Sequence, residues 1–178
     1  MKHREVANLI ANQKIVSIFQ GKCEAGPRAL GNRSILYDPR DSDAQKKINR
    51  IKHREWYRPF AATILFEYAH EWFEMYSLEE SKFMMYAIEA KSHVIDIIPG
   101  VLHVDNTCRI QTVTEEQNYH YYHIIREFYD ITGVPLIFNT SFNLAGEVMV
   151  YTEEDAISTL NRSDIDYLYF PEKSLCIS

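Results

Sequence analysis

Short apolar runs alternate with segments of helical periodicity from one end of the chain to the other. Apolar runs of about four to eight residues bounded by turn residues are typical of strands, and apolar residues three and four apart are typical of helices. The alternation predicts an α/β or α+β fold whose sheet is mostly buried. We expect strands at 15–19, 34–37, 63–66, 83–89, 109–113, 135–138 and 165–170, and helices at 5–12, 42–50, 67–76, 118–132 and 152–160.

The chain has 178 residues without a repeat or linker, so we expect a single domain spanning residues 1–178. No run of 18 apolar residues occurs, and the residues after Met1 lead into a helical pattern instead of a signal peptide. The three cysteines form no CxxC pair, and His120 and His123 form an HxxH pair without a third ligand. We therefore expect a cytoplasmic protein with no membrane contact and no tightly bound metal.

The charge is distributed unevenly along the chain. Residues 1–58 contain 13 Lys and Arg against 6 Asp and Glu, whereas residues 59–178 contain 6 against 19. Nine of the 19 basic residues lie within 28–58. This distribution predicts a local anion site in the first third of the chain, and it argues against a broad nucleic-acid-binding surface.

A glycine-rich stretch, residues 21–34, contains Arg28, Gly31 and Arg33. Glycines allow tight turns and close approach of the backbone to a ligand, and arginines can bind phosphate or carboxylate with two hydrogen bonds. The same spacing also fits an ordinary turn with solvated arginines.

A second stretch, residues 49–60, combines four cations in nine residues with Trp56 and Tyr57. On an extended segment Lys52 and Arg54 would point to one side. The pattern suits a nucleotide, with charge for its phosphates and an aromatic ring for its base, and it also suits single-stranded nucleic acid. The alternative is a solvated basic helix end with packed aromatic residues.

A third stretch, residues 139–147, follows a predicted strand and supplies Thr140, Ser141 and Asn143. Small hydroxyl and amide side chains at the carboxyl end of a strand are typical of ligand sites in α/β folds. A turn satisfied by its own side chains is the alternative. A fourth polar run, residues 103–112, contains Arg109 at the start of a strand. The chain contains no P-loop and no GxGxxG motif.

Taken together, four motifs at residues 21–40, 52–60, 103–113 and 133–147 resemble the C-terminal domain of the O-carbamoyltransferases of the nodulation and antibiotic-tailoring type. The resemblance implies a YrdC-like twisted mixed sheet flanked by helices. It also implies a chain that binds ATP with Mg²⁺ and carbamoyl phosphate and forms carbamoyl-adenylate. Carbamate, or carbamoyl phosphate itself, would attack the α-phosphate of ATP. A sugar-kinase-like transferase domain or subunit, absent from this chain, would pass the carbamoyl group to a hydroxyl.

The same resemblance, with the clustered charges, assigns candidate residues. The phosphate-stabilising catalytic set is Lys52, Arg54 and Arg28, and the substrate- and nucleotide-binding set is Arg33, Arg58, Arg109, Ser141, Asn143, Thr140 and Gly31. Two other functions stay open, a non-catalytic docking partner of a transferase subunit and a YrdC-like RNA-binding module.

Overall fold

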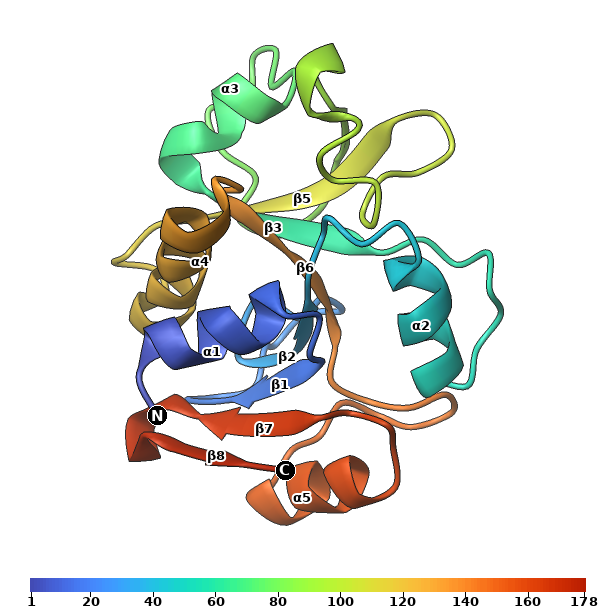
Figure 1. The fold of residues 1–178 in the computed structure, drawn as a ribbon, viewed down its shortest axis with the longest axis vertical. Helices are drawn as coiled ribbons and strands as arrows, with labels where there is room; N and C mark the ends of the chain where they lie inside the picture. Colours follow the sequence, from blue (N-terminus) through green and yellow to red (C-terminus); the bar gives the residue numbers. More distant parts are fainter.

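The computed structural model describes residues 1–178 and confirms a mixed sheet flanked by helices (Figure 1). Eight strands form one sheet in the order β4-β5-β3-β6-β2-β1-β7-β8. β3 pairs with β5 and β1 with β7 in parallel, and the other neighbours are antiparallel. The strands are β1 Val16–Phe19, β2 Arg33–Tyr37, β3 Ala61–Leu65, β4 Ala87–Glu89, β5 Thr107–Val113, β6 Leu136–Ser141, β7 Tyr167–Phe170 and β8 Leu175–Ile177.

Helices cover both sides of this sheet. Figure 1 shows α1 and α4 side by side on one side, α2 on the opposite side and α5 beneath β7 and β8. None of the helices combines the length and the apolar character that crossing a membrane requires. The helices are α1 His3–Ala11, α2 Ala44–Ile51, α3 Ala69–Trp72, α4 Tyr119–Thr132 and α5 Glu153–Asn161, with 3₁₀ turns at Phe66–Tyr68, Ser92–Val94 and Pro171–Lys173.

The two helices with clear end signals in the sequence form where predicted. The Asn118 side chain accepts a hydrogen bond at the start of α4, and Gly133 ends that helix with a φ of 75°. At α5, Thr152 and Asp155 satisfy each other's backbone N–H groups in a capping box. The buried side of α4 carries Tyr121, Ile124, Ile125 and Phe128, while Tyr122 and Tyr129 are half-buried.

Three predicted elements have clearly different bounds in the structure, and one strand was not predicted. The helix expected at 67–76 is reduced to a 3₁₀ turn and the short α3, and the strand expected at 83–89 is reduced to β4. Met84 has a φ of +55°, which no strand permits. β6 continues through Ser141, so 139–141 belong to the strand instead of following it, and β8 was not predicted. In each case the local sequence pattern is ambiguous. Whether the segment pairs with a neighbouring strand then determines the structure that it adopts.

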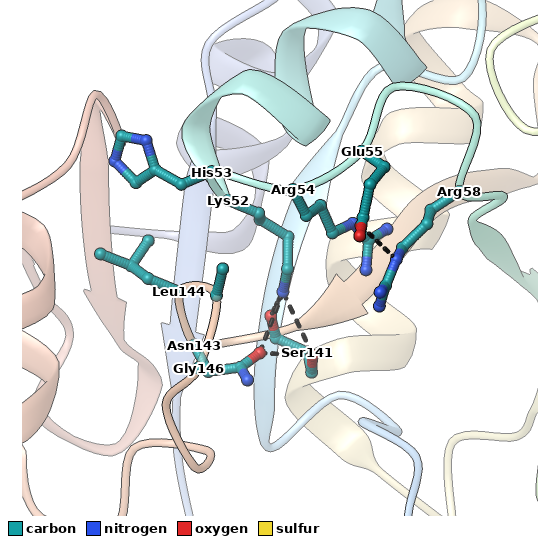
Figure 2. Close-up of a pocket in the computed structure, with 10 residues that line it drawn as sticks. Lys52, His53, Arg54, Glu55, Arg58, Ser141, Asn143, Leu144 and Gly146 are labelled. Carbon is teal, nitrogen blue, oxygen red and sulfur yellow. Dashed lines mark hydrogen bonds and ion pairs between the residues drawn. The ribbon is translucent and has the colours of Figure 1, made fainter.

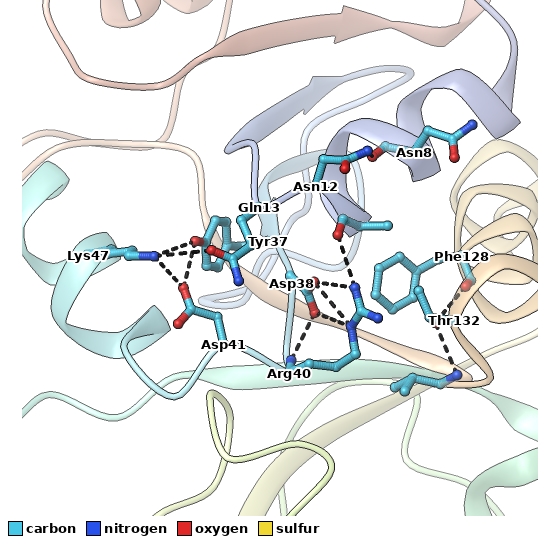
Figure 3. Close-up of polar contacts among 12 residues, drawn as sticks. Asn8, Asn12, Gln13, Tyr37, Asp38, Arg40, Asp41, Lys47, Phe128 and Thr132 are labelled. Carbon is cyan, nitrogen blue, oxygen red and sulfur yellow. Dashed lines mark hydrogen bonds and ion pairs between the residues drawn. The ribbon is translucent and has the colours of Figure 1, made fainter.

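Polar contacts fix the end of β2 against its neighbours (Figure 3). Asp38 is buried and pairs with Arg40 at 2.6 Å, and Arg40 also donates to the carbonyl oxygen of Ala11 at the end of α1. The guanidinium carbon of Arg40 lies 5.6 Å from the ring centre of Phe128 in α4. Asp38 and Arg40 belong to the first motif of the family resemblance. Their contacts are with each other and with neighbouring structural elements.

Candidate active site

Lys52 is the C-cap residue of α2, and its side chain points into the protein toward β6 (Figure 2). Its Nζ donates to the carbonyl oxygen of Ser141 at 2.5 Å, to Ser141 Oγ at 3.2 Å and to Asn143 Oδ1 at 3.0 Å. The Lys52 carbonyl oxygen accepts from the backbone N–H of Ala145 at 2.9 Å. The structure thus brings the lysine of the second stretch together with the serine and asparagine of the third.

The charge on Lys52 is not compensated by a carboxylate. The residue is 3% exposed, and it takes part in none of the ion pairs of the structure. Burial, and then the neighbouring charge of Arg54, lowers the pKa of Lys52 to about 7. An anion bound beside the ammonium group would restore its charged form.

Arg54 is held in place by a residue that the sequence did not single out. Arg54 Nε donates to Asn49 Oδ1 at 2.5 Å, and the amide nitrogen of buried Asn49 donates to the carbonyl oxygens of Trp56 and Arg58. The Arg54 guanidinium lies 4.2 Å from the ring centre of Phe60. Its Nη2 is buried and has no partner, and burial, followed by the charge of Arg58, lowers the Arg54 pKa.

A cavity lies at this junction of α2 and β6. Its volume of about 540 Å³ falls within the range of about 300–1,000 Å³ that is typical of small-molecule sites. Arg58 stands exposed at its rim, where Nε pairs with Glu55 at 2.7 Å. The cavity is lined by Lys52, His53, Arg54, Glu55, Arg58, Ser141, Asn143, Leu144, Ala145 and Gly146.

A smaller cavity of about 120 Å³ adjoins the larger one and shares Arg54 and Ser141 with it. Arg28, Arg109 and Thr140 also line it, and no acidic residue does. Burial, and then the proximity of Arg28, lowers the pKa of Arg109, while Arg28 Nε is buried without a partner. Three arginines without a counter-charge indicate a site for a small anion.

Two of the predicted residues lie outside both cavities. Arg33 donates to the carbonyl oxygens of Gln20 and Gly21, at 2.6 Å and 3.2 Å, and its guanidinium lies 3.5 Å from the ring centre of Phe19. Gly31 has a φ of +104°, and a Cβ there would lie 2.2 Å from the ring of Tyr121. The structure therefore gives both residues a part in shaping the loop that carries Arg28.

The remaining reactive groups lie apart from the cavities. His3 and His120 approach each other within 2.9 Å between α1 and α4, and the chain has no group of three or more His, Cys, Asp or Glu side chains arranged to hold a metal ion. All three cysteines are free, and burial raises the pKa of the Cys108 thiol to about 12. A thiol with such a pKa is not a nucleophile near neutral pH.

Comparison with known proteins decides the family. Residues 7–176 match the family described as "Carbamoyltransferase C-terminus". The chain belongs to this carbamoyltransferase family. It is 43% identical over 164 residues both to an uncharacterized protein of Methanocaldococcus jannaschii and to nodulation protein NolNO of Sinorhizobium fredii, alignments that cover 92% and 91% of this chain.

The carbamoyltransferase C-terminal chain spans 27% and 24% of the length of those two relatives. Among solved structures it is similar to full-length HypF in a phosphate- and nucleotide-bound form, with a TM-score of 0.64 and 19% identity over 95% of this chain and 27% of that one. It is also similar to P. abyssi Sua5 complexed with L-threonine, with a TM-score of 0.51 and 15% identity over 88% of this chain and 43% of that one. This likeness confirms the expected YrdC-like fold.

Proposed function

We propose that this chain binds ATP and carbamoyl phosphate and forms carbamoyl-adenylate, the activated donor for carbamoylation of a hydroxyl group. The observation that carries the proposal is a set of buried and half-buried cations without counter-charges where the two cavities meet. Lys52 and Arg54 belong to the larger cavity, Arg28 and Arg109 to the smaller, and Arg54 to both. Two phosphorylated substrates repel each other, and shared cations offset that repulsion while holding both in line for reaction.

The sizes of the cavities support separate binding sites for the two substrates. The cavity of about 540 Å³ suits the nucleotide, and the cavity of about 120 Å³ has the volume of roughly four water molecules and suits a small anion. Mg²⁺ would enter on the ATP phosphates, since magnesium keeps several waters and needs few protein ligands. Glu55 already pairs with Arg58, and it is the one carboxylate beside the larger cavity.

The proposed reaction balances in two steps. Water cleaves carbamoyl phosphate to carbamate and inorganic phosphate. A carbamate oxygen then forms a bond to the α-phosphorus of ATP, and the bond from that phosphorus to the bridging oxygen of the β-phosphate breaks, so pyrophosphate leaves with the electron pair. Lys52 and Arg54 stabilise the charge that develops on the phosphoryl oxygens, and an anionic carbamate needs no general base.

Transfer to the acceptor hydroxyl is assigned to a partner, a sugar-kinase-like transferase domain or subunit. The relatives named above are roughly four times as long as the aligned region, because this chain spans 27% and 24% of their length. Those relatives therefore have room for such a domain. The phosphate and nucleotide named for HypF are consistent with the two substrates proposed for this chain.

The test is carbamoyl-phosphate-dependent exchange of labelled pyrophosphate into ATP, together with calorimetric binding of ATP. Lys52→Ala and Arg54→Ala are expected to abolish exchange while the chain stays folded. Removal of one such charge costs about 2.7–4 kcal/mol of transition-state stabilisation, or about 100- to 1,000-fold in rate. Arg50→Ala is the matched control, because Arg50 is exposed near the same end of α2 and lines neither cavity.

Wild-type exchange in both site variants would overturn the assignment of Lys52 and Arg54. A folded wild-type chain that binds neither ATP nor carbamoyl phosphate would instead support the docking role. Retained ATP binding with lost exchange in the two variants is the result that the proposal requires.

A further inference from the structure

Asn139 forms part of the floor of the smaller cavity. It lies on β6 opposite Ala61 of β3, and Ala61 lies opposite Arg109 of the next strand, β5. All three line the smaller cavity, so they form a row across one face of the sheet. Asn139 itself is 1% exposed, and sequence analysis did not single it out.

The hydrogen bonds of Asn139 fix the orientation of its amide. Its Nδ2 donates to the carbonyl oxygen of Ala29 and to Thr63 Oγ1, each at 3.0 Å. A carbonyl oxygen can only accept, so the amide nitrogen must face Ala29. The hydroxyl of Thr63 donates to Gln111 Oε1, and Gln111 in turn donates to Leu30 O, so Thr63 accepts from Asn139. Both contacts are therefore made by the amide nitrogen of Asn139, and its amide oxygen points away from Ala29 and Thr63.

That oxygen is buried and has no partner. Among the side chains that line the smaller cavity it is the one acceptor in this condition, and Arg28 Nε and Arg54 Nη2 are unpartnered donors there. A fully ionised phosphate or carboxylate group would satisfy the arginines but has no hydrogen to offer Asn139. The cavity is therefore complementary to a small anion that also carries an N–H or O–H donor.

We infer that Asn139 recognises the NH₂ of the carbamoyl group and selects carbamoyl donors over acyl donors that lack an N–H. This inference rests on the proposed function and adds a specificity-determining contact to it. In carbamoyl phosphate a phosphoryl group and an amide NH₂ lie at opposite ends of one small molecule. Carbamate retains the NH₂, so the contact can persist through the adenylation step. An acyl donor without the N–H is rejected because its binding leaves the buried amide oxygen of Asn139 without a hydrogen-bond partner.

The experiment compares carbamoyl phosphate with acetyl phosphate, in which a methyl group replaces the NH₂. Calorimetric affinities are measured for the wild type, Asn139→Ala and Thr63→Val. The wild type is expected to bind carbamoyl phosphate about 10- to 100-fold more tightly than acetyl phosphate, the range set by one unsatisfied buried acceptor. Asn139→Ala should bring this ratio close to one, mainly through weaker binding of carbamoyl phosphate. Thr63→Val removes one partner of the amide nitrogen but leaves the Asn139 oxygen, so it should keep the preference.

A wild type that binds both phosphates equally would overturn the inference without any variant. The same holds if Asn139→Ala folds and keeps the full preference, or if Thr63→Val loses the preference as completely as Asn139→Ala does. These results differ from failure of the proposed function, in which the wild type binds neither ATP nor carbamoyl phosphate.

Discussion

Lys52 is a residue whose placement costs folding stability. Its ammonium group is buried without a carboxylate, and its pKa falls from 10.5 to about 7. The unfolded chain therefore binds more protons than the folded chain between those two values. The unfavourable contribution of Lys52 is complete below pH 7, and it shrinks as the pH rises toward 10.5. Such costs are common where a site must hold charge ready for a ligand.

Lys52→Met is accordingly expected to raise the free energy of unfolding, and to raise it more at pH 6 than at pH 9. The difference between the two pH values should be on the order of 2 kcal/mol. Thermal or urea unfolding at both pH values measures it. Lys46→Met, on the exposed side of α2, should show no such pH dependence. A gain that is equal at both pH values would mean that Lys52 keeps an ordinary pKa.

Sequence reasoning located most of the residues that line the two cavities, because cations and small polar side chains in four short stretches carry a recognisable pattern. It could not separate Arg28 from Arg33. Both stand in the same glycine-rich stretch, yet one lines a cavity and the other binds loop carbonyls. Asn49 and Asn139 each begin one of these stretches, yet neither was singled out. The role of each depends on hydrogen bonds that only the folded chain forms, to Arg54 and Arg58 for Asn49 and to Ala29 and Thr63 for Asn139.

At the scale of elements, Asp38 holds Arg40, whose contacts join the end of β2 to α1 and α4. Asp38→Ala removes the buried carboxylate that holds Arg40, which is 36% exposed at its side chain. The expected loss is about 1–3 kcal/mol of unfolding free energy, since the freed guanidinium can turn partly to water. Urea denaturation measures this loss. Lys46→Ala, in an exposed pair with Asp43, serves as control and should change stability by less than about 0.5 kcal/mol. Equal effects of the two changes would contradict the structural role of Asp38.

Helices and strands with strong local signals in the sequence were predicted well, and those without such signals were not. α4 and α5 have capping residues at their starts, and α4 has a stop glycine, so their ends could be read from the sequence. The segment 67–76 has helical periodicity, but the chain turns away at Phe73, which bridges to Ala90. β8 forms because β7 offers it an edge, a condition that no local pattern contains.

At the scale of the whole molecule, few of the 13 basic side chains of residues 1–58 are both exposed and unpaired. Six of these side chains pair with carboxylates, and Lys52 and Arg54 are wholly or partly buried. The paired residues are Arg4, Lys14, Arg40, Lys46, Lys47 and Arg58. The structure therefore offers little continuous free positive surface to a long polyanion.

RNA binding is expected to be weak and steeply salt-dependent. A filter-binding or fluorescence titration with a transfer RNA should show affinity that falls sharply between 50 and 200 mM salt, the range over which counterion release weakens nonspecific binding. ATP affinity should change much less over the same range. Tight RNA binding that persists at physiological salt would favour the RNA-binding module.

Lys52 bonds to Ser141, which is 89 positions away along the chain. Arg109 and Asn139 come together only because both their strands flank β3. No contiguous fragment shorter than most of the chain can hold the site, so the site forms only with the long-range strand pairing of the sheet. Substrates that bind the completed site must then protect the entire sheet against unfolding, by an amount set by their concentration relative to their dissociation constants.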